Sequence, residues 1–156
     1  MTEAISHGQP AVLLVEDNRT DAALALHAVR AAGVLATVHV VSNGAAALEF
    51  LRLQPAASDE DVRLVLLDIK LPKIGGIDVL GRIKADPAMS RIPVVMFTSS
   101  AEPSDIQASY RLGANSYVVK PVDYAEFAET IVRTVNYWLE VNLTAERQEP
   151  AAPPRE

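Results

Sequence analysis

Short apolar runs alternate along this chain with longer stretches whose apolar residues recur at helical spacing. The runs are rich in valine, isoleucine and leucine, and they largely lack the alternation of polar and apolar residues that marks a strand with one exposed face. They lie at residues 11–15, 38–41, 64–67, 93–97 and 117–119. This pattern predicts parallel strands that are buried on both faces of a sheet.

The intervening stretches predict helices at residues 20–32, 45–52, 77–84 and 104–112, with a long final helix after Asp123. Asp123 is a typical N-cap residue, and Gly33 and Gly113 stand where a helix stop is expected. Five strands that alternate with five helices predict an α/β domain built on a doubly wound five-stranded parallel sheet.

Residues that can carry chemistry directly follow four of the predicted strands. Doubly wound sheets bind ligands beyond the carboxyl ends of their strands, near a switch in strand order. Those positions hold Glu16 and Asp17, then Asp68, Thr98 and Lys120. Each of these residues alone is unremarkable in a loop or a helix cap, but all of them at the same edge of one sheet indicate a site.

The residue types in this group suit a phosphoryl group and a divalent cation. Three carboxylates packed closely repel one another and tend to take up protons. A hard cation removes that repulsion, and Mg²⁺ prefers a few carboxylate oxygens together with water and phosphate. Lys120 can neutralise phosphoryl oxygens, and Thr98 can donate a hydrogen bond to them.

Composition narrows the class of function. Of the 156 residues, 49% are apolar and 22% are charged, and the net charge is −6. The chain has no run of lysine or arginine, which argues against binding to nucleic acid. It has no cysteine, which excludes disulfides and thiolate metal sites. Because the first ten residues lack a signal-peptide pattern and no apolar run could span a bilayer, we expect a cytoplasmic protein without membrane association.

The chain is expected to form one domain at residues 10–139, after a short N-terminal segment at residues 1–9. Residues 140–156 contain Pro150, Pro153 and Pro154 among small and charged residues, and they are predicted to be a mobile tail. No helix-turn-helix fits this tail, so we expect the protein to act through contacts with other proteins.

Four segments in fixed order resemble the signatures of response-regulator receiver domains. They are residues 13–18, which read Leu-Leu-Val-Glu-Asp-Asn, and residues 68–76, 93–99 and 113–121. The resemblance extends over residues 10–138. It implies the flavodoxin-like strand order 2-1-3-4-5 and a signalling protein that a histidine kinase phosphorylates on Asp68. It also implies that the chain is not an enzyme acting on an outside substrate, although it would catalyse its own phosphorylation and dephosphorylation.

The resemblance further implies a role for each residue of the site. Mg²⁺ would be held directly by Asp17, Asp68 and the backbone carbonyl of Lys70, and largely through water by Glu16. Thr98 and Lys120 would bind the phosphoryl oxygens, and Tyr117 would turn inward as Thr98 shifts. The peptide between Lys120 and Pro121 would be cis, as in relatives.

Two enzyme-like alternatives are weaker. A phosphatase of the haloacid-dehalogenase type needs an aspartate two residues after its nucleophile, where this chain has Lys70. A flavin-binding protein needs a phosphate loop after the first strand, where Glu16 and Asp17 would repel phosphate. A receiver-like scaffold that works without phosphorylation stays open as an alternative, although no residue of the site is missing.

The final helix has two apolar stripes. One contains Phe127, Ile131 and Trp138, and the other contains Tyr124, Ala128, Val132, Val135 and Leu139. A surface helix of a monomer usually needs one such stripe. We therefore predict a homodimer interface that comprises Tyr124, Ala128, Val132, Val135, Tyr137, Trp138 and Leu139. The alternative is a more deeply buried helix that the tail covers.

Smaller features resemble a narrower group, the stand-alone receivers paired with phytochrome-type photoreceptor kinases. They are the turn at Asn18, the sequence at residues 120–123 and the sequence at residues 137–139. Members of that group form dimers through the fourth helix, fifth strand and fifth helix, which implies the same for this chain.

Overall fold

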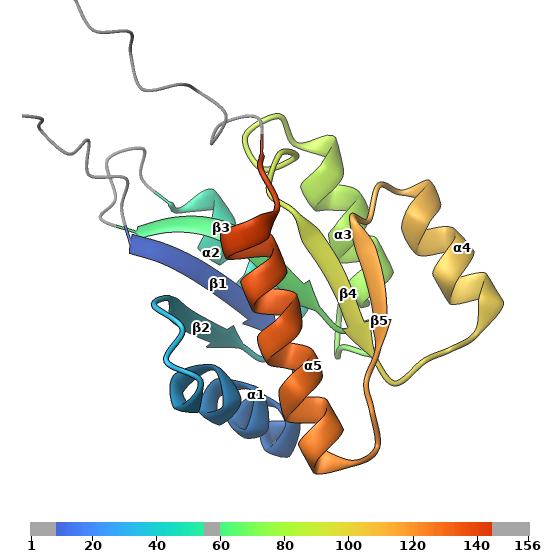
Figure 1. Cartoon of the computed structure of the whole chain (residues 1–156). Helices are drawn as coiled ribbons and strands as arrows, with labels where there is room; N and C mark the ends of the chain where they lie inside the picture. Colours follow the sequence, from blue (N-terminus) through green and yellow to red (C-terminus); the bar gives the residue numbers. More distant parts are fainter. Residues whose placement is uncertain (1–8, 55–59, 145–156) are drawn as a thin grey trace, which may run out of the picture.

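Five parallel strands form the central sheet, in the order β2-β1-β3-β4-β5 (Figure 1). The computed structural model describes residues 9–54 and 60–144. Its strands are Gln9–Val15 (β1), Thr37–Val41 (β2), Glu60–Leu67 (β3), Val94–Thr98 (β4) and Ser116–Val119 (β5). The predicted fold class and strand order are therefore confirmed. The order reverses between β1 and β3, so the carboxyl ends of these two strands flank the switch point.

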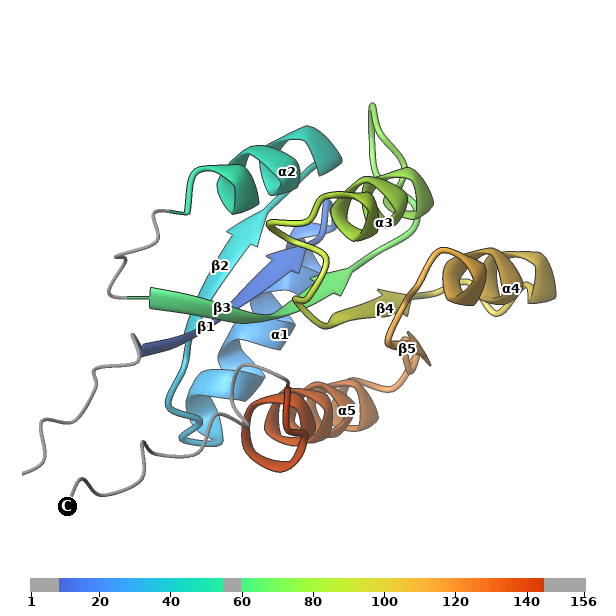
Figure 2. The ribbon, with the colours of Figure 1, turned by 90° about the horizontal axis from the view of Figure 1, so that it is seen from above.

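Helices cover both faces of the sheet (Figure 2). They are Arg19–Ala31 (α1), Gly44–Arg52 (α2), Gly76–Ala85 (α3), Pro103–Arg111 (α4) and Tyr124–Asn136 (α5). α1 and α5 lie on one face, α2 and α3 lie on the other, and α4 packs beside α3 and β5. None of the helices in the described part of the chain is long and apolar enough to cross a membrane.

The strands separate two hydrophobic cores. In β1, Leu13 and Val15 face the core under α2 and α3, whereas Val12 and Leu14 face the core under α1 and α5. All four side chains are almost fully buried. Since successive side chains of a strand point to opposite faces, a strand covered on both sides needs an unbroken apolar sequence. This explains why the apolar runs of the sequence lack an alternation of polar and apolar residues.

β3 begins earlier than its apolar run. The predicted strand began at residue 64, but the observed one begins at Glu60, because residues 60–62 pair with residues 9–11 of β1. Within this polar beginning, Arg63 Nε lies 3.0 Å from Asp61 Oδ2. Backbone pairing to a neighbour extends the strand here, and hydrophobic patterning does not detect it.

The final helix buries a different set of residues from the one predicted. Phe127, Ile131, Val135 and Leu139 are all buried in the core under α1 and α5. The prediction that Val135 and Leu139 belong to a dimer interface is therefore wrong. A π-helical turn, Tyr137–Val141 (η1), follows α5, and its wider turn rotates the side chains so that Leu139 rather than Trp138 enters the core.

The rest of the predicted interface is only partly accessible. Tyr124 and Tyr137 are exposed, whereas Ala128, Val132 and Trp138 are half-buried and pack against the same core. The helical structure also continues to Val141, beyond the predicted domain end at residue 139. The predicted tail from residue 145 onward, and residues 1–8 of the predicted N-terminal segment, lie outside the described residues.

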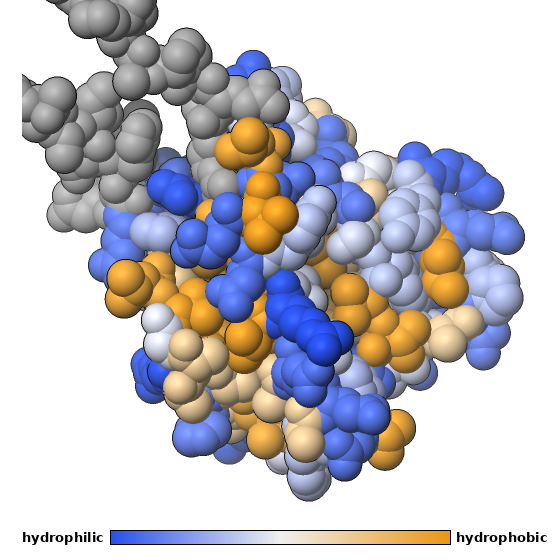
Figure 3. Space-filling view, in the orientation of Figure 1, coloured by the Kyte–Doolittle hydropathy of each residue, from blue (hydrophilic) through white to orange (hydrophobic). Residues whose placement is uncertain are grey.

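Other apolar side chains are exposed near the amino end of α5. Figure 3 shows apolar residues over β5, between α4 and α5. Val119 at the end of β5, Val122 in the following loop and Tyr124 at the start of α5 are 42%, 98% and 67% exposed. This face therefore keeps accessible apolar surface, although its residues differ from the predicted set.

Candidate functional site

The acidic residues of the site lie where two adjacent strands end. Glu16 and Asp17 directly follow β1, and Asp68 directly follows β3. Backbone hydrogen bonds continue past both strand ends, because Asp68 N–H donates to Val15 O at 3.1 Å and Glu16 N–H donates to Val41 O at 2.9 Å. The sheet itself therefore holds the backbone of Glu16 and Asp68.

Three carboxylates meet at this edge. One side-chain oxygen from each of Glu16, Asp17 and Asp68 lies within 4.8 Å of the others. Glu16 and Asp68 are buried, whereas Asp17 is exposed, so the group opens to solvent on the side of Asp17. A cluster of carboxylate oxygens with one accessible side fits a hard divalent cation.

Burial affects the protonation of Glu16. It raises the pKa of this carboxyl to about 7, and the nearby charge of Asp68 adds to the rise. Hydrogen bonds from Lys120 and from the Asn18 backbone N–H act in the opposite direction. A positive charge beside Glu16 therefore favours its ionised form.

Lys120 supplies positive charge at this group of carboxylates. Its Nζ lies 2.5 Å from Glu16 Oε1, 2.9 Å from Asp21 Oδ2 and 3.0 Å from Asp68 Oδ2. Burial alone would lower the pKa of Lys120, but the hydrogen bonds to Glu16 and Asp21 and the charge of Asp68 raise it above its ordinary value. The ammonium is therefore charged and in contact with the acidic group.

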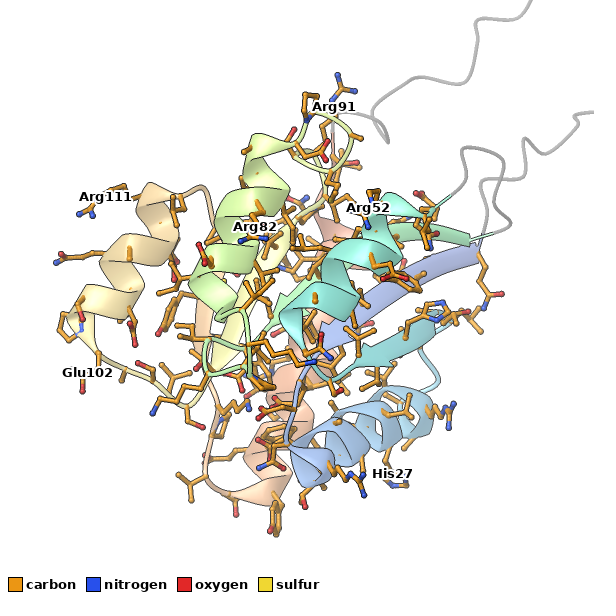
Figure 4. The ribbon with its side chains drawn as sticks, turned by 180° about the vertical axis from the view of Figure 1, so that it is seen from behind. His27, Arg52, Arg82, Arg91, Glu102 and Arg111 are labelled. Atoms are coloured by element: carbon orange, nitrogen blue, oxygen red, sulfur yellow. The ribbon has the colours of Figure 1, made fainter. Side chains whose placement is uncertain are left out.

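Cations elsewhere on the surface do not share this position. Figure 4 shows Arg52, Arg82, Arg91 and Arg111 projecting outward from α2, α3, the loop before β4 and α4. All four are exposed. Lys120, by contrast, is buried, and its Nζ contacts Asp68. The side chain of Lys70, two residues after Asp68, is also exposed and lies in the loop between β3 and α3.

Asp21 belongs to this group although the sequence analysis did not identify it. It lies in the first turn of α1, where its N–H donates to Asn18 Oδ1, the N-cap, at 3.0 Å. Acidic residues are common in the first turn of a helix, which makes Asp21 look like an ordinary partner of the helix dipole. The available signal was that α1 begins directly after Asp17 and its N-cap Asn18, which places its first turn at the same edge of the sheet.

A second set of contacts joins the site to α4. Thr98 ends β4 and is buried, and its Oγ1 accepts a hydrogen bond from Ser100 N–H at 3.3 Å. Tyr117 donates its hydroxyl to Ser100 O at 2.8 Å, and Ser100 Oγ donates to Asp105 Oδ2 in α4 at 2.6 Å. Thr98 and Tyr117 were predicted from the sequence, but Ser100, which connects them, was not.

The peptide between Lys120 and Pro121 is trans, since the described residues contain no cis peptide bond. The prediction of a cis bond is therefore wrong. The trans form of a peptide before proline is favoured by about 0.5–1 kcal/mol. With this trans bond, Lys120 N–H still donates to Thr98 O at 2.7 Å and Nζ still reaches the carboxylates. No contact of the site requires the cis form.

Gly76 lets α3 begin directly beside the backbone of Asp68. A Cβ atom added at Gly76 would lie 1.9 Å from Asp68 O and 2.7 Å from Ile69 Cα. The Gly76 N–H also donates to Ile69 O at 2.8 Å. No side chain fits at residue 76 without moving the backbone that carries Asp68.

Comparison with known proteins identifies similar chains. A family model described as the response regulator receiver domain matches residues 12–132. The probable methanogenesis regulatory protein FilR2 of Methanothrix harundinacea is 37% identical over 128 residues, which cover 82% of this chain and 83% of FilR2. Response regulator Rcp1 of Synechocystis is 34% identical over 130 residues, which cover 83% of this chain and 88% of Rcp1.

Solved structures show the same similarity. The crystal structure of the Mn²⁺-bound form of Rcp1 matches with a TM-score of 0.77 at 32% identity, over 86% of this chain and 97% of that one. The crystal structure of the phosphorylated cyanobacterial phytochrome response regulator RcpA matches with a TM-score of 0.80 at 33% identity, over 88% of this chain and 99% of that one.

The close approach at Gly76 generates a prediction about stability. We expect Gly76→Ala to lower the free energy of unfolding by at least about 2 kcal/mol, because its methyl group must displace the Asp68 backbone. Gly75→Ala is a matched control, since a Cβ there would lie 3.8 Å from Ile69 O, and we expect a change within about 1 kcal/mol. Urea denaturation measures both values. Equal stabilities of the two variants would contradict this account.

Proposed function

Since the chain belongs to the response regulator receiver family, we propose that it accepts a phosphoryl group on Asp68 from a partner histidine kinase. Receiver domains are signalling proteins that pair with histidine kinases, and phosphorylation of an aspartate is typical of the family. The observation that supports Asp68 most directly is its contact with Lys120 Nζ, at 3.0 Å, within the group of three carboxylates.

The chemistry assigns each residue a separate task. A carboxylate oxygen of Asp68 attacks phosphorus and forms the new P–O bond while the P–N bond to the donor imidazole breaks. Lys120 neutralises charge on the transferred group, and Thr98 donates a hydrogen bond to it once its hydroxyl turns from Ser100. Asp68 Oδ1 accepts a hydrogen bond from Ile69 N–H at 2.7 Å, which fixes the orientation of the carboxylate.

We propose Mg²⁺ as the cation of the site. Glu16, Asp17, Asp68 and the backbone carbonyl of Lys70 would hold it. Oxygen ligands with one solvent-facing side suit Mg²⁺, which keeps several waters. The similarity to the Mn²⁺-bound form of Rcp1 supports a divalent cation here. A bound cation would supply electrostatic neutralisation of the phosphoryl oxygens.

The contacts around Ser100 support a route from the site to the surface. Thr98 Oγ1 and the Tyr117 hydroxyl both contact the backbone of Ser100, whose own hydroxyl contacts Asp105 in α4. Movement of the Thr98 hydroxyl toward a phosphoryl group would give up its bond with Ser100 N–H. We propose that this change shifts the loop before α4 and the face formed by α4, β5 and α5.

We propose a phytochrome-type photoreceptor kinase as the donor. The support is the similarity to RcpA, a cyanobacterial phytochrome response regulator whose structure covers most of this chain. We also propose that the protein acts in the cytoplasm, as the partner of such a kinase.

Phosphorylation itself is tested by intact-protein mass spectrometry after incubation with acetyl phosphate. We expect one phosphoryl adduct on the wild type, no adduct with EDTA, and no adduct on Asp68→Asn. Asp78→Asn, a substitution of an exposed aspartate in α3, is the matched control and should keep the adduct. An adduct of undiminished yield on Asp68→Asn would place the phosphoryl group elsewhere. A wild type without an adduct from either acetyl phosphate or a phosphorylated kinase would favour a scaffold that works without phosphorylation.

We also propose that two copies of the chain associate through the exposed apolar face at Val119, Val122 and Tyr124. We expect light scattering to give twice the mass of one chain for the wild type and a monomer for the Val122→Glu, Tyr124→Glu double variant, because both charges would be buried unpaired. Leu35→Glu adds a charge at another exposed apolar residue, 84% exposed after α1, and should stay dimeric. A monomeric wild type, or a dimeric double variant, would contradict this interface.

A further inference from the structure

We propose that Asp21 is a positioning residue for the phosphoryl site. It keeps Lys120 in place when Glu16 and Asp68 bind a divalent cation. This inference rests on the proposed function and extends it to a residue of α1. It is based on one buried ammonium that contacts two carboxylates able to share a cation and a third carboxylate that lies outside that group.

The ammonium of Lys120 is shared among three carboxylates. A lysine has three N–H donors, and Lys120 Nζ has one carboxylate oxygen each from Glu16, Asp21 and Asp68 within 3.0 Å. Its side chain is only 5% exposed. Water therefore replaces little of what a lost carboxylate contact would provide.

The three partners of Lys120 differ in one respect. Glu16 and Asp68 belong to the carboxylate group that can share a cation, together with Asp17. Asp21 is outside that group among the described residues, although its Oδ2 lies 2.9 Å from Lys120 Nζ. Lys120 and a cation thus compete for oxygens of Glu16 and Asp68, but they do not compete for Asp21.

Contacts at the start of α1 and in the core hold the backbone of Asp21. Its backbone is held by the N-cap bond to Asn18 Oδ1, and the same helix is anchored in the core by Ala25 and Val29. The side chain of Asp21 is 24% exposed, whereas that of Glu16 is 2% exposed. The carboxylate of Asp21 is therefore more accessible to water than that of Glu16.

This difference gives Asp21 its task. A buried ammonium that loses a carboxylate partner without replacement is destabilised. When Glu16 releases Lys120, the bond to Asp21 remains and keeps Nζ beside Asp68, where a phosphoryl oxygen would be. Without Asp21, the ammonium would retain Glu16 and Asp68 more strongly, and cation binding would have to break those contacts.

A double-mutant cycle on cation affinity tests this inference. The probe is Mn²⁺ alone, without a phosphodonor, and its free concentration is read by electron paramagnetic resonance. The four proteins are the wild type, Asp21→Ala, Lys120→Met and the double variant. We expect Asp21→Ala to weaken Mn²⁺ binding by about 3- to 10-fold when Lys120 is present, and by less than about twofold in the Lys120→Met background.

Comparison of the two backgrounds, with Lys120 and with Lys120→Met, distinguishes a positioning role of Asp21 from direct electrostatic attraction between Asp21 and the cation. If Asp21 only attracts the cation through space, its removal will weaken binding by the same factor in both backgrounds, and this result would overturn the inference. Unchanged affinity of Asp21→Ala would overturn it too. If Asp21→Ala does not fold, Asp21→Asn, which keeps an acceptor oxygen, replaces it, and we expect a smaller loss in the same direction. A wild type that binds no Mn²⁺ would contradict the proposed function itself.

Discussion

One buried ammonium, surrounded by carboxylates, is the interaction on which the functional edge of this molecule depends. Lys120 Nζ contacts Glu16, Asp21 and Asp68 from three different elements of the fold. Burial raises the pKa of Glu16 to about 7, and the hydrogen bond and charge of Lys120 oppose this rise. The arrangement keeps Asp68 beside the ammonium of Lys120 before any phosphoryl group arrives. The carboxylates of the site still outnumber this one positive charge.

The fold brings these charged residues together through the burial of apolar residues, and attraction between the charges has little part in it. The three central strands, β1, β3 and β4, are buried on both faces, so their apolar residues fix where they end, and the polar residues that follow must lie at the carboxyl edge of the sheet. The close approach of Gly76 to the Asp68 backbone then sets the position of α3. Hydrophobic burial thus places the site, and the ammonium of Lys120 balances its charge.

Most of the fold and the centre of the site could be predicted, because both follow from where buried strands end. Glu16, Asp17, Asp68, Thr98 and Lys120 were identified in this way. Asp21 was missed, because one acidic residue in a first helical turn is common. Ser100 was missed because its backbone makes two of its contacts. Leu139 was misplaced, because an ideal helical period cannot foresee the π-helical turn after α5. Val135 was misplaced because the sequence shows two adjacent apolar stripes on this helix and does not show which of them faces the core. The Lys120–Pro121 bond was assigned by resemblance, and its own contacts give no reason for the cis form.

The central claim is that a phosphoryl group on Asp68 becomes the partner of Lys120 and Thr98. A crystal structure of the protein with Mg²⁺ and beryllofluoride, an acyl-phosphate mimic, tests it most directly. We expect beryllofluoride on Asp68, with Lys120 Nζ and Thr98 Oγ1 each within hydrogen-bonding distance of a fluorine. We also expect that Lys120 still contacts Asp21. Beryllofluoride on a different residue, or on Asp68 with Lys120 still bound to Glu16 and away from fluorine, would contradict this claim.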